Sequence, residues 1–479
     1  MNHKMIRYLL GLITMIEAAL MMLPMLVSMI YGESIMPFAL TAALMIAVSL
    51  PFVVKKPTNT RIYAKEGYIC VASAWLIMSA FGALPFVISG VIPNYIDAFF
   101  ETVSGFTTTG ASLMTAIEGN PFGVLFWRSF THWIGGMGVL VFMLAILPSG
   151  DGNAIHLMRA ETPGPTKGKI VPKLRSTAMI LYLIYMALTV AEMIALLCTG
   201  MPLYDSIVNA LATAGTGGFA VKNASIASYA NPAAEWVIAV FMFIFGVNFN
   251  VYFMALIGKA KDALKSEELK VYLSIIGVSV VLFTASTWGL FDKAGDCIRS
   301  AFFQTTSIMS TTGFSTADFN LWPQISRSFI VLLMFIGACA GSTAGGLKIS
   351  RVLIIVKNVV KEVKHLLRPN SVNVLKIDGE VVREETAKSA VNYFALYFAI
   401  MAATSLLISV DGFSFETNVT AAITCANNIG PGLGAVGPVE NFSLFSPFSK
   451  IVLSLTMLFG RLEIIPMIVL FSPSAWKSR

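Results

Sequence analysis

Charged residues are scarce in this sequence. Aspartate, glutamate, lysine and arginine make up only 12% of its 479 residues, whereas a soluble domain carries roughly 25% of them. Hydrophobic residues make up 56%. This composition excludes an ordinary soluble protein and predicts one body built from several membrane spans, rather than roughly three soluble domains.

Cysteine and histidine are also rare, which limits the chemistry open to the chain. The five cysteines are scattered without C-x-x-C spacing, so we interpret them as small apolar residues. The four histidines, at positions 3, 132, 156 and 365, form no cluster, and the predicted spans contain no paired carboxylates. These absences argue against an intramembrane lipid-processing enzyme, the alternative of another class, and no cofactor is expected.

The net charge of +7 lies mainly in short loops between apolar stretches, where the positive-inside rule explains it, so no nucleic-acid partner is expected. Assigning the basic loops to the cytoplasm gives ten spans in the bilayer, with both termini inside. The first such loop contains Lys55, Lys56, Arg61 and Lys65, and the second contains Arg159, Lys167, Lys169, Lys173 and Arg175.

The predicted fold is an all-α polytopic membrane protein with two extra N-terminal transmembrane helices. Four helix, pore-loop, helix repeats follow in a pseudo-fourfold arrangement. The expected limits are residues 1–60 for the N-terminal helices, 61–150 for repeat 1, 151–262 for repeat 2, 263–370 for repeat 3 with a broken returning helix, and 371–479 for repeat 4.

Each repeat contains a short segment with a glycine, placed after an apolar stretch too short to cross a bilayer. An ion entering the membrane must exchange its water for other oxygen dipoles, which backbone carbonyls can supply. Carbonyls converge on one axis only where the backbone takes angles that glycine tolerates. A single such segment could equally be a tight turn, but four recurrences favour an ion-binding filter. We call these filter segments: Thr108, Thr109 and Gly110; Thr216, Gly217 and Gly218; Thr311, Thr312 and Gly313; Asn428, Ile429 and Gly430.

The returning segment of repeat 3, residues 325–367, would be about 60 Å long as one helix, which is too long for one crossing. Its glycines at four-residue spacing would also suit a continuous helix packed closely on a neighbour. We favour a break that places a loop under the filter as a gate. The candidate gate residues are Gly341, Ser342, Thr343, Gly345, Gly346, Lys348 and Arg461.

Arg461 is predicted near the middle of the last span, where arginine costs about 2.5 to 3.5 kcal/mol on insertion. We expect it to face the pore near the gate loop as a positive barrier to a cation. Snorkelling, or a structural role in bonding carbonyls, is the alternative. Glu463 would point to another helix face, so pairing with Arg461 is not expected. Lys348 is a weaker candidate, because it could mark the cytoplasmic boundary.

Other charged and aromatic residues receive simpler interpretations. Acidic residues near the outer starts of the pore helices are expected to act as helix caps that also make the mouth acidic: Asp97, Glu101, Asp205, Asp296 and Glu416. Interfacial anchoring is expected for Trp127, Arg128, Trp236 and Arg327. Proton relay and simple packing are both open for Glu17, His132 and Glu192.

Several stretches spread over nearly the whole chain carry a family resemblance. They are residues 104–110 (SGFTTTG), 126–129 (FWRS), 133–138 (WIGGMG), 340–348 (AGSTAGGLK), 427–432 (NNIGPG) and 460–463 (GRLE). On these stretches the sequence resembles the Trk/Ktr/HKT superfamily of cation transporters, and most closely its bacterial Trk-type potassium uptake membrane subunits.

The resemblance implies an ion, a membrane and partners. Members with glycine at all four filter positions are associated with potassium, and members with serine at the first are associated with sodium, so Gly110 favours potassium. A bacterial inner membrane, a homodimer and a cytosolic nucleotide-binding regulatory subunit are also implied. A sodium-permeable or unselective member of the superfamily is the first alternative, and an inverted-repeat carrier is another, disfavoured by four similar pore loops. Coupling to protons or sodium and channel-like conduction are both open.

Overall fold

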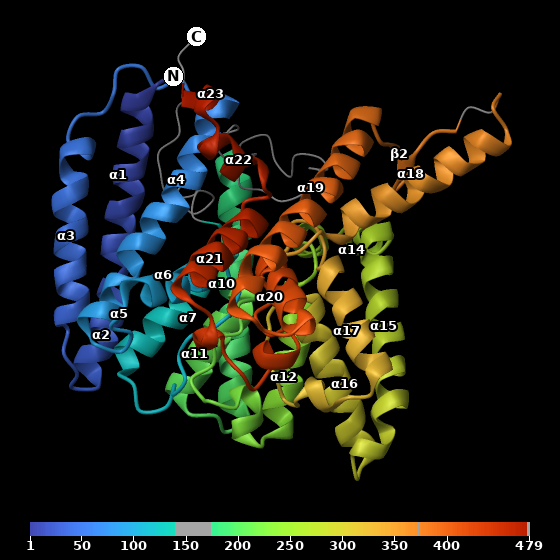
Figure 1. Cartoon of the computed structure of the whole chain (residues 1–479), viewed down its shortest axis with the longest axis horizontal. Helices are drawn as coiled ribbons and strands as arrows, with labels where there is room; N and C mark the ends of the chain where they lie inside the picture. The colour runs from blue at the N-terminus through green and yellow to red at the C-terminus, as the bar shows by residue number, and fades with distance from the viewer. Residues whose placement is uncertain (139–173, 371–372, 477–479) are drawn as a thin grey trace.

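The computed structural model describes residues 1–138, 174–370 and 373–476, and this part of the chain is mostly helical (Figure 1). The last residues of the expected repeat 1, 139–150, lie outside the described residues. The predicted basic loop with Arg159, Lys167, Lys169 and Lys173 lies outside them as well. The all-α polytopic fold is confirmed.

The chain begins with the two predicted N-terminal spans. They comprise α1 (His3–Leu20), α2 (Met22–Ile30) and α3 (Met36–Val53). The side chain of Asn2 caps α1 by accepting a hydrogen bond from the amide of Met5 at 3.1 Å. Such a cap satisfies one of the amides that a helix start leaves unpaired.

The order of elements then repeats as a long helix, a short helix that ends in a loop, and a returning helix. Set 1 contains α4 (Ala64–Gly82), α5 (Leu84–Ile88), α6 (Tyr95–Phe106) and α7 (Phe122–Gly136). Set 2 contains α10 (Leu174–Cys198), α11 (Leu203–Gly215), η1 (Ser225–Tyr229), α12 (Pro232–Phe245), α13 (Phe249–Leu256) and α14 (Ala260–Ala263). Set 3 contains α15 (Glu267–Thr287), η2 (Trp288–Leu290), α16 (Ala294–Met309), η3 (Phe319–Leu321), α17 (Gln324–Ile336) and α18 (Ile349–Leu367). Set 4 contains α19 (Glu384–Ile408), η4 (Ser409–Asp411), α20 (Phe415–Asn427), η5 (Gly434–Val436), η6 (Phe442–Leu444), α21 (Pro447–Arg461), α22 (Ile465–Phe471) and α23 (Pro473–Trp476).

Long apolar helices occur at the start of the chain and at the start of each set. Within the described residues, six are long and apolar enough to cross a membrane: His3–Ile30, Met36–Val53, Ala64–Ile88, Ala178–Cys198, Glu267–Leu290 and Glu384–Asp411. The returning helices are shorter or broken, and α12 and α13 are bent by 89° against each other. The count of ten spans and the limits of the repeats therefore stay predictions.

A small hairpin lies between α18 and α19. Its strands, β1 (Lys376–Ile377) and β2 (Glu380–Val381), pair antiparallel, with Lys376 opposite Val381. The turn residues Asp378 and Gly379 both have positive φ, 53° and 82°. An Asp-Gly pair is favoured in such two-residue turns because its backbone tolerates these angles.

Helix contacts close the four sets into a circle. The returning helix of each set packs on the short helix of the next: α7 on α11, α12 on α16, α17 on α20, and α21 back on α6. The short helices thus lie inside the molecule, between the long helices (Figure 1). This arrangement brings the four loops that follow the short helices toward one region.

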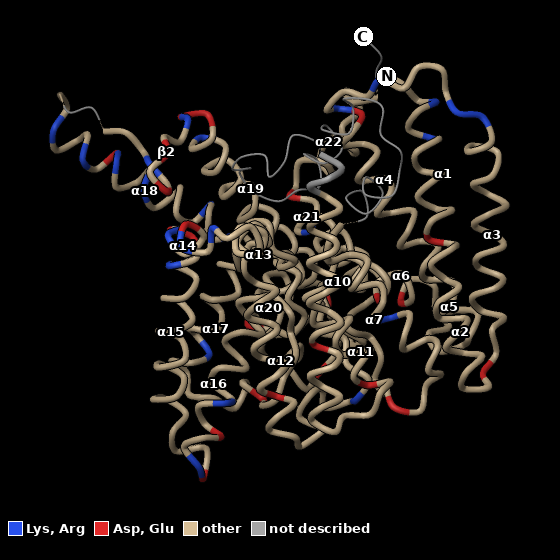
Figure 2. The backbone as a smooth tube through the Cα atoms, turned by 180° about the vertical axis from the view of Figure 1, so that it is seen from behind, with Lys and Arg blue, Asp and Glu red and all other residues tan. Residues whose placement is uncertain are grey.

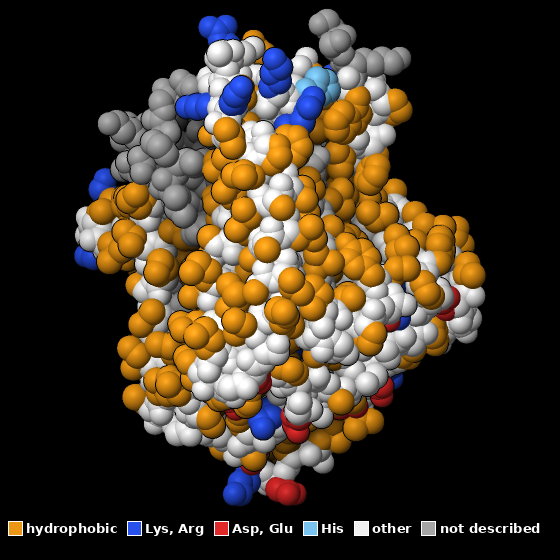
Figure 3. All heavy atoms as spheres, turned by 90° about the vertical axis from the view of Figure 1, so that its left-hand side faces the viewer, with side chains coloured by type: hydrophobic (Ala, Val, Ile, Leu, Met, Phe, Trp, Pro, Cys, Tyr) orange, Lys and Arg blue, Asp and Glu red, His pale blue; other side chains and the backbone are white. Residues whose placement is uncertain are grey.

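Charge and apolar surface are separated along the molecule. Lysines and arginines gather at the end that carries both termini and along α18 (Figure 2). On the face shown in Figure 3, hydrophobic side chains cover the middle, and the charged side chains lie toward the two ends. An apolar belt between charged ends is the surface that a bilayer requires.

Candidate ion-binding site

The four filter segments share the same unusual backbone shape. The first residue of each is left-handed, with φ of 56° at Thr108, 55° at Thr216, 56° at Thr311 and 55° at Asn428. The glycine two positions later is left-handed too, with φ of 78° at Gly110, 75° at Gly218, 82° at Gly313 and 97° at Gly430. A left-handed residue with a β-carbon costs about 1–2 kcal/mol. Strain of this kind persists only where the surrounding structure enforces it, and it is typical of functional sites.

Hydrogen bonds at the ends of the short helices hold this shape. In every segment the amide of the middle residue reaches back to a carbonyl in the helix: Thr109 N to Ser104 O, Gly217 N to Ala212 O and Thr312 N to Ser307 O at 2.9 Å, and Ile429 N to Thr424 O at 3.0 Å. This is the Schellman ending, in which the chain leaves a helix through a left-handed residue. Glycine usually occupies that residue, but here threonine or asparagine does.

The glycines bring the four segments into a closed ring, which we call the filter ring. A β-carbon added to each glycine would collide with a carbonyl oxygen of the next segment: Gly110 with Gly217 O at 2.0 Å, Gly218 with Thr312 O at 2.0 Å, Gly313 with Ile429 O at 2.0 Å, and Gly430 with Thr109 O at 2.7 Å. The fourth segment thus returns to the first. Glycine is required at these positions both for its backbone angle and for the close approach of the next carbonyl.

Buried hydroxyl and amide side chains bond to one another along the filter segments and, at one point, between two of them. Thr109 Oγ1 lies 2.8 Å from Thr107 Oγ1, and Thr312 Oγ1 lies 2.6 Å from Ser310 Oγ. The Nδ2 atom of Asn428 donates to Thr109 Oγ1 at 3.0 Å, which ties the fourth segment to the first. These bonds limit the freedom of the ring, because a buried polar group that lost its partner would cost about 1–3 kcal/mol.

The returning segment of set 3 is interrupted where the gate loop is predicted. Helix α17 ends at Ile336 and α18 begins at Ile349, and we call residues 337–348 the gate loop. The amide of Gly345 donates to Thr311 Oγ1 at 2.7 Å, and a β-carbon at Gly345 would lie 2.4 Å from Asn427 O. The gate loop therefore lies directly against the third and fourth filter segments.

Arg461 joins the gate loop to set 1. Its Nη1 donates to Thr343 O at 2.8 Å, and its Nη2 donates to Gly135 O at 2.6 Å and to Gly136 O at 2.8 Å. The predicted proximity of Arg461 and the loop is observed, and the guanidinium bonds carbonyls, as the structural alternative expected. Glu463 does not pair with Arg461 but with Arg351, whose Nη1 lies 3.0 Å from Glu463 Oε1.

Lys348 does not lie at an exposed boundary. Its side chain is buried, and its ammonium donates to the carbonyl of Ala344 within the gate loop. A buried ammonium needs such a partner, because an unpaired charge is costly away from water. Lys348 therefore helps to shape the gate loop, and its interpretation as a marker of the cytoplasmic boundary is wrong.

Glu268 is a buried residue that the sequence interpretation missed. From the start of α15 its Oε1 accepts hydrogen bonds from Ala340 N at 2.7 Å and from Ser350 N at 3.1 Å, so one carboxylate ties the gate loop to the first turn of α18. The bend between α12 and α13 supplies further partners, since Cys339 N donates to Gly246 O at 3.1 Å and Phe249 N donates to Gly341 O at 3.0 Å. The one available sequence signal was the pair Glu267-Glu268 at the start of a span otherwise flanked by lysines.

Polar contacts at the ends of the short helices join neighbouring sets. The contacts are Phe122 O with Tyr204 Oη at 2.6 Å, Glu235 with Arg299 at 2.6 Å, Arg327 with Glu416 at 2.5 Å, and Lys450 with Asp97 at 2.8 Å. Asp97 and Glu416 thus serve as ion-pair partners between sets. The side chains that cap α6 and α20 are those of Asn94 and Ser414.

Three further interpretations of individual residues are wrong. Glu101 lies within α6, fully buried, and not at its first turn. Arg128 and Trp127 are buried inside the protein and do not anchor it at a membrane interface, since Arg128 pairs with Glu101 and Trp127 Nε1 donates to Gly82 O at 3.0 Å. Hydropathy locates a residue along a span but does not tell which side of the helix faces protein.

Both ring nitrogens of His132 are engaged in hydrogen bonds. Its Nδ1 lies 2.7 Å from Gly105 O, and its Nε2 accepts from Phe219 N at 3.3 Å. A carbonyl needs a donor and an amide needs an acceptor, so the ring carries its proton on Nδ1 and is neutral. Glu17 and Glu192 are fully buried in α1 and α10.

Comparison with known proteins agrees with this architecture. The family model for TrkH, a cation transport protein, matches residues 34–289 and 289–478. The Trk system potassium uptake proteins TrkH of Salmonella typhimurium and Escherichia coli (strain K12) are each 35% identical to this chain, with 100% of both chains covered. The crystal structure of the potassium transporter TrkH from Vibrio parahaemolyticus matches with a TM-score of 0.89 and 29% identity over 100% of both chains. The matches contradict the alternative of an intramembrane enzyme, and the chain belongs to the TrkH family of cation transport proteins.

Proposed function

We propose that this protein carries potassium into a bacterial cell through the filter ring. The observation that carries the proposal is the closed cycle in which each filter glycine lies against the carbonyl of the next segment. We propose that four backbone carbonyl groups, those of Thr109, Gly217, Thr312 and Ile429, surround a common centre, and the cycle of close approaches between segments supports this arrangement. Rings of carbonyl oxygens replace the water of a potassium ion in known selectivity filters.

The short helices support a cation as the occupant. Helices α6, α11, α16 and α20 all end at the filter ring. A helix C-terminus carries roughly half a negative charge, so four such ends favour a cation over an anion. Glycine at all four ring positions favours potassium over the sodium-permeable alternative.

The gate loop and Arg461 are proposed to close the path beneath the filter ring. The loop touches Thr311, a filter residue, and Arg461 ties it to set 1. A guanidinium at this depth would repel a cation until the loop moves. The glycines of the loop, with φ of 68° at Gly337, 72° at Gly341 and 74° at Gly346, supply a backbone that can rearrange.

The membrane potential is sufficient to drive uptake. A single charge gains about 2.3 kcal/mol per 100 mV, which supports roughly fiftyfold accumulation. Conduction through the ring therefore needs no coupled proton or sodium ion.

The surface supports a homodimer and a cytosolic regulatory subunit. Helix α18 projects from the body of the molecule (Figure 1) and exposes an apolar row made of Val356, Val359, Val363 and Leu366. We propose that a second copy of this chain covers that row, because an apolar helix face of this length requires cover. The basic end of the molecule, which carries both termini, is proposed to face the cytoplasm and to dock a nucleotide-binding regulatory subunit (Figure 2).

The proposal is tested with purified protein in liposomes. Potassium or rubidium uptake is measured under an imposed inside-negative potential, with sodium as the competitor. We expect uptake that sodium inhibits only at much higher concentration than potassium does. Equal inhibition by the two ions would support the unselective alternative and refute potassium selectivity.

A further inference from the structure

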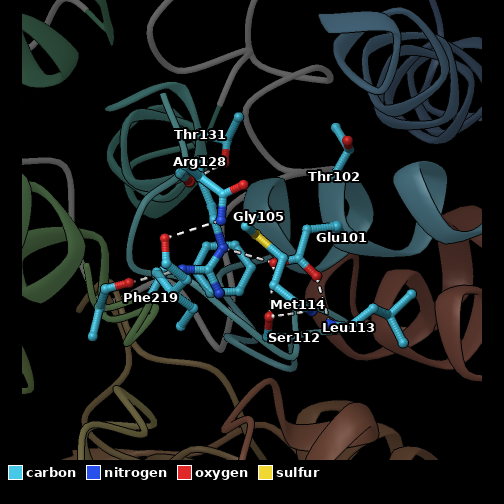
Figure 4. A network of polar contacts seen from close by, with 12 residues as sticks. Glu101, Thr102, Gly105, Ser112, Leu113, Met114, Arg128, Thr131 and Phe219 are labelled. Atoms are coloured by element: carbon cyan, nitrogen blue, oxygen red, sulfur yellow. Dashed lines mark hydrogen bonds and ion pairs between the residues drawn. The ribbon is translucent and has the colours of Figure 1, made fainter. Parts of the chain in front are cut away.

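A buried ion pair stands beside the filter ring at the junction of sets 1 and 2. Arg128 in α7 and Glu101 in α6 have side chains that are 3% and 0% exposed, and Arg128 Nε lies 2.7 Å from Glu101 Oε1. Glu101 also accepts from Ser112 Oγ at 3.0 Å and from Leu113 N at 2.7 Å, in the chain that follows the first filter segment (Figure 4). Both members of the pair belong to set 1, and Glu101 ties them to the loop that follows the first filter segment.

The other face of Arg128 contacts set 2 directly after its filter glycine. Arg128 Nη1 donates to Ala220 O at 2.9 Å, and the guanidinium carbon lies 3.6 Å from the ring centroid of Phe219 (Figure 4). A cation over an aromatic face is attracted to the ring, and more strongly when it is desolvated. Arg128 thus bridges the first short helix and the residues directly after the second filter segment with one planar group.

His132 makes a second bridge between the same two parts, one turn further along α7. It bonds Gly105 O in α6 and Phe219 N in set 2. Its ring fills the space behind the second filter segment, because a β-carbon at Gly217 would lie 2.2 Å from His132 Cγ. We call Arg128 and His132 the α7 clamp.

The corresponding positions of set 4 are apolar. Gly135 and Gly460 occupy equivalent places in the two sets. An added β-carbon would lie 1.8 Å from Phe106 O at Gly135 and 2.1 Å from Ala426 O at Gly460. Each of these carbonyls belongs to the residue two positions before the left-handed residue of its filter segment, Thr108 or Asn428. Counting back from these glycines, Arg128 and His132 correspond to Leu453 and Met457, both fully buried. Apolar side chains can therefore fill these places.

A buried ion pair adds little stability over well-packed apolar side chains. The polar residues at this junction therefore do something that leucine and methionine do not do in set 4. They bond Phe219 and Ala220, the two residues directly after the second filter segment, with defined length and direction.

We propose that Arg128 and His132 are positioning residues that determine the ion selectivity of the filter ring by holding its second segment against the first. The proposal rests on the proposed function. Potassium and sodium differ in size, so selectivity depends on how firmly the carbonyls of Gly217 and Thr109 are held. Neither side chain of the α7 clamp needs to touch the ion.

The test compares selectivity at matched amounts of folded protein. Arg128→Lys keeps the charge but loses the planar fork that bonds Glu101 and Ala220 together. In liposomes, the ratio of the sodium inhibition constant to the potassium KM should fall about tenfold, which equals about 1.4 kcal/mol. His132→Met, which places the residue of set 4 in set 1, should lower the same ratio in the same direction.

Arg299→Lys is the matched control. Arg299 bonds Glu235 in α12 at 2.6 Å and Asp296 in α16 at 2.7 Å, so it joins sets 2 and 3 through residues of two helices and not through residues next to a filter glycine. Its variant should keep the wild-type ratio. A wild-type ratio in Arg128→Lys, even with a lower thermal midpoint, would show that the pair is merely structural and overturn the proposal. If Arg128→Lys does not fold, the ratio of the sodium inhibition constant to the potassium KM measured for His132→Met decides: a lowered ratio supports the proposal, and a wild-type ratio overturns it. Absence of potassium uptake in the wild-type protein would instead refute the proposed function.

Discussion

Replacing Gly110 by serine tests the geometry of the filter ring at its most constrained point. Gly110 has φ of 78°, and an added β-carbon would lie 2.0 Å from the carbonyl oxygen of Gly217. To restore a contact of about 3 Å, the two segments must separate by about 1 Å. The left-handed backbone adds about 1–2 kcal/mol of strain. One of the four carbonyls of the ring is thereby displaced.

The displaced carbonyl should weaken the binding of potassium more than the binding of sodium. Sodium accepts fewer oxygen ligands, and it holds them at shorter distances. We expect Gly110→Ser to lower the preference for potassium at least about tenfold, equal to about 1.4 kcal/mol. Purified protein in liposomes, with sodium and potassium in competition, measures the change. The protein should still fold, since this strain energy is small compared with the total free energy gained by burying the side chains of the protein.

Gly119→Ser is the matched control for backbone strain. Gly119 is also left-handed, with φ of 87°, but an added β-carbon would meet no atom within 4 Å. This variant should keep the wild-type preference. If folded Gly110→Ser also kept its potassium preference intact, the assignment of Gly110 to the filter ring would be wrong.

Three further changes test the gate loop and the contacts between sets. Arg461→Ala removes three bonds to carbonyls at 2.6–2.8 Å and should raise resting potassium flux on the order of tenfold; unchanged flux and unchanged potassium dependence would reject the barrier. Glu268→Gln keeps one acceptor but loses the charge that holds Ala340 and Ser350, so it should destabilise the gate loop by about 1–2 kcal/mol. Potassium flux into liposomes should then rise, whereas lowered flux would contradict a closing role. Lys450→Met leaves Asp97 without its partner at 2.8 Å and should lower the free energy of unfolding by about 1–3 kcal/mol. The double variant Asp97→Asn with Lys450→Met should recover part of this loss, and strict additivity of the two changes in thermal unfolding would show that the pair has no coupling.

Much of the fold was predictable, because it depends on local composition. Runs of apolar residues long enough to cross a bilayer, short loops rich in lysine and arginine, and four short segments with a glycine are all visible in the printed sequence. The short apolar stretch expected before the first filter segment is helix α6 (Tyr95–Phe106). These features could be predicted from the sequence because they depend on each residue and on its near neighbours in the chain.

The errors concern residues whose partners lie far away in the chain. Arg128 looked like an interfacial anchor, since it stands near the predicted end of a span, but its partners are Glu101 in the same set and Ala220 in the next. Lys348 looked like a boundary residue and is buried. Periodicity and charge could not reveal these pairings, because either side of the helix could have faced protein.

The sequence by itself determined that the chain lies in a membrane, that it is helical, and that four similar segments interrupt it. Only the tertiary structure decided that each filter glycine lies against the next segment's carbonyl, and that Arg461 reaches both Thr343 and Gly135. The physical reason is that hydropathy and backbone preference act over a few residues. A ring, in contrast, exists only when segments hundreds of positions apart pack in one order and close.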